Sequence, residues 1–112
     1  MITVVVCLGP LGNLVSADAS GHAHKGRLGT DIVCAAVTVL LRTTMNVLSK
    51  PGVSPVLEAT TAGRGSLAFR VSAFTEADIP LLQYAATFLQ EGLSSLAGEY
   101  PEAVEMRVIE NT

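Results

Sequence analysis

Short apolar runs and helix-spaced apolar positions take turns along this chain. Residues 2–8 form a continuous, largely β-branched run, which predicts a buried strand with Cys7 as core filler. A glycine- and proline-containing turn at residues 9–13 and a second run at 14–20 predict that this strand returns as a hairpin. Residues 21–30 contain three glycines and little that could pack, which predicts a flexible surface loop.

The next apolar positions recur at the spacing of an α-helix over residues 32–48. Thr30 or Asp31 is suited to cap this helix, and Pro51, Gly52 and Pro55 end it. The positions expected to face the core are Val33, Ala36, Val37, Leu40, Leu41 and Thr44.

The second half of the chain repeats the order of hairpin and helix. Residues 56–62 and 67–74 predict a hairpin with a turn at 63–65, and its buried face is expected to comprise Leu67, Phe69, Val71 and Ala73. Thr75-Glu76-Ala77-Asp78 is a signature that opens a helix, which is expected to run to about residue 96 with Gly98 just past its end. The buried face of this helix is predicted to be Leu81, Leu82, Ala85, Phe88, Leu89 and Leu93.

A last strand at residues 104–109 completes the order β-β-α-β-β-α-β. This order predicts an α+β domain in which two helices pack on one face of a mainly antiparallel sheet. The length of 112 residues suits a single domain over residues 1–112.

Composition narrows the class of function. Hydrophobic residues make up 49% of the chain and charged residues only 15%, which argues against disorder and favours an apolar surface used for self-association. A net charge of −3 without a run of lysine or arginine argues against a nucleic-acid partner. The apolar runs are too short to span a bilayer, so we expect a cytoplasmic protein whose two cysteines are free thiols.

A histidine and a cysteine flank the glycine-containing loop. With Asp31 as the cap, Cys34 is the third helical residue, where backbone N–H groups are unpaired and the helix dipole stabilises a thiolate. His22 lies twelve residues earlier, so a loop that closes on itself could bring its imidazole within reach of the thiol as a base. By residue type alone, a buried structural cysteine and a solvated loop histidine are the commoner interpretation. A zinc site of His22, His24 and Cys34 lacks the spacing of paired cysteines.

Two segments here, Gly21-His22-Ala23 and the run Gly-Thr-Asp-Ile-Val-Cys-Ala-Ala-Val at 29–37, resemble the paired signature of the ribosomal-processing cysteine proteases, the Prp family. The resemblance implies a small cytoplasmic homodimeric endopeptidase without metal or cofactor, in which Cys34 is the nucleophile and His22 the general base and then acid. It implies that Asp31 is the family's acidic residue at the helix start and that Gly21 is one hinge of a mobile loop. The implied loop residues are Ala23, His24, Lys25, Gly26, Arg27, Leu28, Gly29 and Thr30.

The resemblance also implies a substrate, a precursor of large-subunit ribosomal protein twenty-seven that loses a short N-terminal extension. Two other functions stay open from the sequence. One is a non-catalytic, ribosome-associated binding module of the same fold, against which the presence of both His22 and Cys34 argues. The other is a metal or thiol sensor that uses His22, His24 and Cys34.

Overall fold

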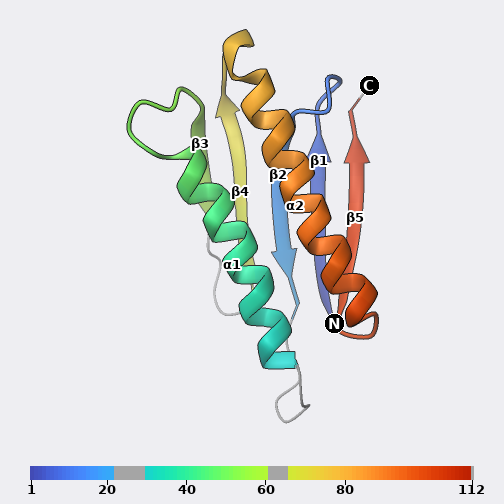
Figure 1. The fold of residues 1–112 in the computed structure, drawn as a ribbon. Coiled ribbons are helices and arrows are strands. Elements are labelled where there is room, and N and C mark those ends of the chain that lie inside the picture. Colours follow the sequence, from blue (N-terminus) through green and yellow to red (C-terminus); the bar gives the residue numbers. More distant parts are fainter. Residues whose placement is uncertain (22–29, 61–65, 112) are drawn as a thin grey trace.

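The computed structural model describes residues 1–21, 30–60 and 66–111, which form a five-stranded sheet with two helices lying side by side across one face (Figure 1). The elements are β1 (Ile2–Leu8), β2 (Leu14–Ser20), α1 (Thr30–Leu48), β3 (Val56–Thr60), β4 (Ser66–Ala73), a 3-10 turn (Glu76–Asp78), α2 (Ile79–Glu99) and β5 (Val104–Glu110). The predicted order and the α+β class are confirmed. The predicted turn at 63–65 and most of the predicted loop at 21–30 lie outside the described residues.

The sheet has the strand order β3-β4-β2-β1-β5. Neighbours pair antiparallel except β1 and β5, which run parallel from Ile2 beside Val104 to Leu8 beside Glu110. β4 and β5 follow each other in the chain and run in the same direction, so a long crossover must connect them. α2 forms this crossover. The sheet is therefore mainly antiparallel, as predicted.

The core lies between the sheet and the helices, and β1 shows how it is built. Every second residue of β1 is buried, namely Ile2, Val4, Val6 and Leu8, whereas Cys7 and the residues in step with it are half-buried. Successive strand residues point to opposite faces, and both helices cover the same face. The prediction that Cys7 fills the core is wrong for this reason.

The core stripe of α1 follows the predicted spacing, except that Ala36 is only half-buried. Val33, Val37, Leu41, Thr44 and Leu48 are buried, and Leu40 packs against them half-buried. The buried hydroxyl of Thr44 donates a 2.8 Å hydrogen bond to the Leu40 carbonyl. Where the two helices meet, a Cβ added to Gly92 would come within 2.8 Å of Leu40 Cδ2, so this glycine allows a close approach.

Three details of the second half differ from the prediction. α2 continues to Glu99, so Gly98 lies inside it. Phe88 is 45% exposed while Ala86 is buried, because the core-facing stripe of α2 is turned slightly from the predicted one. Ala73 is also exposed, at the end of β4. Within the described residues, no helix is both long and apolar enough to cross a membrane.

Candidate active site at the start of α1

Cys34 lies in the second turn of α1, beside the core but not sealed within it. Its side chain is half-buried and packs against the cluster that contains the fully buried Val33. Ile32, two residues before Cys34, is 63% exposed. Exposed and buried side chains therefore lie within three residues of one another at this end of the helix. The sulfur is a free thiol placed at a boundary between core and surface.

The helix begins earlier than the sequence predicts. Its first residue is Thr30, so Asp31 lies within the first turn instead of capping the helix, and Cys34 is the fifth residue instead of the third. In a helix with this start, the Cys34 N–H bonds to the carbonyl four residues earlier, and the unpaired N–H groups belong to residues 30–32. Donors for a bound anion are therefore the backbone groups just before Cys34, not its own.

Gly21 is the last residue that the structure describes before residue 30. It leaves β2 with φ +116°, and an added Cβ would collide with the Met1 carbonyl oxygen. Only glycine accommodates both the positive φ and this close approach. The position directly before His22 is thus fixed by the packing of β2 against the start of β1.

His22 and the rest of the loop that the resemblance implies lie outside the described residues. These are Ala23, His24, Lys25, Gly26, Arg27, Leu28 and Gly29. The described ends of this connection, the end of β2 and the start of α1, lie at the same end of the molecule (Figure 1). Elsewhere in the described chain, no three His, Cys, Asp or Glu side chains gather as metal ligands, and the suggested set of His22, His24 and Cys34 includes two undescribed residues.

The sequence reasoning missed an apolar groove of about 170 Å³ between α1 and α2, at the far end from Cys34. It is lined by Thr43, Thr44, Val47, Leu48, Leu81, Tyr84, Ala85 and Phe88. Tyr84 is 71% exposed at its rim. The signal was present in the two aromatic residues four positions apart on α2, but Phe88 was assigned to the core.

Comparison with known proteins places this arrangement in a family. The sequence model described as cysteine protease Prp matches residues 1–105. The chain belongs to the Prp family. Family membership makes it a cysteine protease of the ribosomal-processing type, as the signature around Cys34 predicted.

Solved structures agree with this assignment. This Prp-family chain matches SMU.848 from Streptococcus mutans with a TM-score of 0.80 and 28% identity, covering 99% of this chain and 96% of that one. It also matches an essential ribosomal processing protease Prp from Staphylococcus aureus, which carries a covalently linked product peptide. The TM-score there is 0.77 at 26% identity, covering 96% of this chain and 99% of that one. A substrate-peptide complex of the S. aureus protease has the same fold, with a TM-score of 0.78 at 22% identity and the same coverage. No curated protein matches the chain at a significant level.

Proposed function

We propose that this protein is an endopeptidase whose nucleophile is Cys34 and whose general base is His22. The supporting observation is the contrast between its two cysteines. Cys7 sits in the middle of the sheet, where Ser16 of β2 and Ile109 of β5 flank it. Cys34 is equally half-buried, but it lies near the start of α1, twelve residues after His22 in the chain.

The fold supports His22 as the partner of Cys34. The packing of Gly21 against Met1 fixes where the chain leaves β2, and α1 begins at the same end of the molecule. The segment that starts with His22 connects these two points. These two described ends support the proposal that the imidazole of His22 acts on the Cys34 thiol.

The proposed reaction runs through an acyl-enzyme. The Cys34 thiolate attacks the carbonyl carbon of the scissile peptide, the carbon–nitrogen bond breaks, and the imidazolium of His22 gives its proton to the leaving amine. Water then attacks the thioester as His22 removes its proton, which releases the acid product and restores the thiol. The unpaired N–H groups of residues 30–32 hold the oxyanion of each tetrahedral intermediate.

The proposed substrate is the precursor of large-subunit ribosomal protein twenty-seven, and that substrate would place the enzyme in the cytoplasm. The net charge of −3 on this chain is compatible with binding a basic ribosomal protein. A second copy of the chain is the other proposed partner. The exposed Tyr84 and Phe88 beside the groove between the helices provide an apolar surface for that self-association.

The test compares Cys34→Ala with Cys7→Ala on a synthetic peptide that spans the N-terminus of the host's own ribosomal protein twenty-seven. We expect cleavage, followed by mass spectrometry, to fall by a factor on the order of 10⁴ or more in Cys34→Ala and to be unchanged in Cys7→Ala. Both variants should keep the wild-type circular dichroism spectrum. Undiminished cleavage by Cys34→Ala would exclude the proposed nucleophile. Binding of the peptide by the wild-type protein without any cleavage would favour the non-catalytic module.

A further inference from the structure

The two edges of the sheet carry different side chains. The β5 edge bears Glu105, Arg107 and Glu110, and Arg107 donates a 3.1 Å hydrogen bond to Glu105. The β3 edge bears a single charge, that of Glu58. Charged side chains along an edge discourage the addition of another strand, so β5 is protected in a way that β3 is not.

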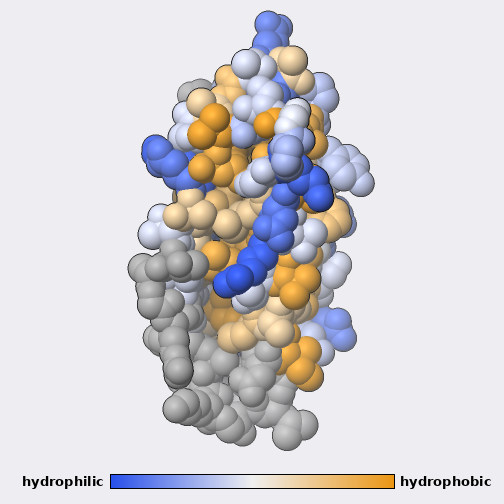
Figure 2. All heavy atoms as spheres, turned by 90° about the vertical axis from the view of Figure 1, so that its left-hand side faces the viewer, coloured by the Kyte–Doolittle hydropathy of each residue, from blue (hydrophilic) through white to orange (hydrophobic). Residues whose placement is uncertain are grey.

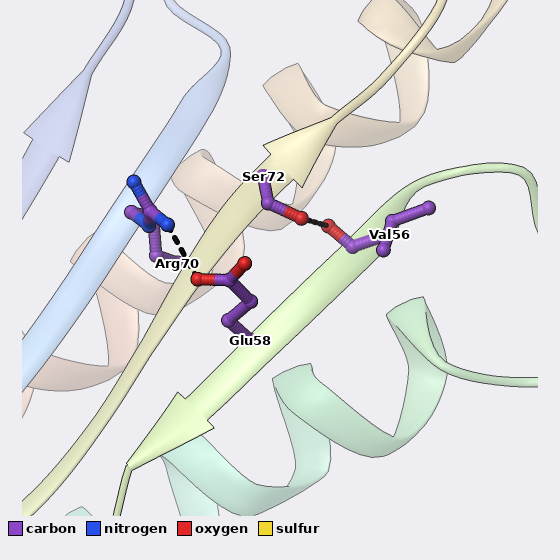
Figure 3. Close-up of polar contacts among 4 residues, drawn as sticks. All are labelled: Val56, Glu58, Arg70 and Ser72. Carbon is purple, nitrogen blue, oxygen red and sulfur yellow. Dashed lines mark hydrogen bonds and ion pairs between the residues drawn. The ribbon is translucent and has the colours of Figure 1, made fainter.

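The polar contacts of β3 are directed inward, towards β4. The carboxylate of Glu58 is bound by Arg70, and the hydroxyl of Ser72 donates a 3.2 Å hydrogen bond to the Val56 carbonyl (Figure 3). Within the part of the chain that the structure describes, β4 is the only strand that pairs with β3. Because alternate residues of an edge strand turn their N–H and C=O groups outward, β3 presents backbone donors and acceptors on its free side.

The side chains of β3 leave this free side accessible. Four of its five residues are exposed, and only Leu57 is half-buried against the core. Figure 2 looks onto this side of the molecule and shows hydrophobic atoms beside a narrow hydrophilic band. Exposed apolar residues of the two elements include Val56 on β3 and Val39 on α1, which are 54% and 62% exposed.

The edge leads towards the candidate nucleophile. β3 follows α1 in the chain and runs back beside it, so its last residue points to the end of the molecule where α1 begins (Figure 1). At about 1.5 Å per helical residue and 3.3 Å per strand residue, α1 is as long as roughly nine extended residues. β3 accounts for five of these, and an extended chain bound to it would need about four more to reach the level of the α1 start.

We infer that the free edge of β3 binds the substrate polypeptide as an added strand and directs the scissile bond towards Cys34. This inference rests on the proposed function. An extended peptide is the occupant whose backbone offers donors and acceptors at the spacing of β3. Two copies joined through five-residue edges alone would fall well short of the roughly 1,200–2,000 Å² that stable interfaces bury, which argues against a second copy there.

Amide hydrogen exchange tests the inference without turnover. Cys34→Ala protein is saturated with the peptide from the N-terminus of ribosomal protein twenty-seven, and exchange is compared with that of the free variant. We expect alternate amides of β3 to slow by a factor of ten or more, and amides of the other edge, β5, to keep their rates. Protection at β5 or elsewhere with β3 unchanged would overturn the inference. So would protection of β3 in the peptide-free variant that grows with protein concentration, because it would assign the edge to a second copy.

A backbone-methylation series on the same peptide separates this inference from the proposed function. Each peptide carries one N-methyl group, which removes one donor, and kcat/KM is measured with the wild-type enzyme. An added strand predicts losses of about tenfold at every second position and small effects between them, since alternate N–H groups face β3. Cleavage of the parent peptide with a flat methylation profile would overturn the strand model alone. Absence of cleavage of any peptide would count against the proposed function itself.

Discussion

The two helices of this fold begin in different ways. Ahead of α2, the Thr75 N–H and hydroxyl both donate to the Asp78 carboxylate, at 2.8 and 3.1 Å, and Asp78 is only 7% exposed. Near the start of α1, the described side chains are the exposed Ile32, the buried Val33 and the half-buried thiol of Cys34. The α2 start is closed by its own polar groups, whereas the α1 start places a half-buried thiol at the surface of the core.

This difference separates a structural helix start from the one at which we propose the reaction takes place. At α2, the Thr75 N–H lowers the pKa of Asp78 below its ordinary value of 3.8; burial opposes this, and the hydroxyls of Ser54 and Thr75 add to it. Both donors of Thr75 are used to fix the start of this helix. At α1, the unpaired N–H groups of residues 30–32 are the donors that our mechanism assigns to a reaction intermediate.

The largest expected contrast is chemical, between Cys34 near the α1 start and Cys7 in the sheet. A thiolate paired with an imidazolium stays reactive at mildly acidic pH, whereas an unassisted thiol does not. We expect iodoacetamide at about pH 6 to label Cys34 on the order of tenfold faster than Cys7 or more. Peptide mapping with Cys7→Ala and Cys34→Ala as references measures this. Equal rates would remove the chemical distinction between the two sites.

The α2 start should respond in stability and not in catalysis. Thr75→Ala removes a capping hydroxyl, and we expect it to lower the free energy of unfolding by about 1 kcal/mol. Urea denaturation measures this loss, and peptide cleavage by the folded variant should match the wild type. A change in kcat/KM without a change in stability would mean that the α2 start takes part in the reaction.

Acid should weaken the α2 start through Asp78. Because its pKa is lower in the folded protein than in the unfolded chain, the carboxylate stabilises the fold above the ordinary value of 3.8. This contribution is lost as the pH falls through the lower folded value. We therefore expect wild type to melt above Asp78→Asn at about pH 6 and the two Tm values to converge below about pH 4. A Tm difference that persists unchanged at low pH would contradict the role of the charge.

The smallest expected effect compares one acid at each helix start, through Asp31→Asn and Glu76→Gln. Asp31→Asn removes a negative charge from the first turn of α1, and Glu76→Gln removes one from the 3-10 turn that precedes α2. Each loss should lower stability by only about 0.3–1 kcal/mol. If Asp31 supports the candidate site, its variant alone should also lower kcat/KM, by about tenfold. Matched stability losses with unchanged cleavage in both would reduce Asp31 to a helix-start residue.

The sequence by itself determined the order of the elements and most of their bounds. Strand and helix periods in residues 2–20 and 32–48 depend on local pattern, and the cap signature at Thr75 and Asp78 depends on contacts three residues apart. The signature around Cys34 also identified the family, because family-specific residues are read directly from the chain. These properties depend on residues close together in the chain, so they can be predicted without the tertiary structure.

The tertiary structure alone decided which side of each element meets a partner. Cys7 and Phe88 were assigned to the core because both are apolar. Cys7 lies on the sheet face opposite the two helices, and Phe88 lies beside the groove between them. The parallel pairing of β5 with β1 and the free edge of β3 likewise depend on contacts between distant segments. Local pattern specifies that a residue is apolar or a strand extended, but only packing specifies what covers it.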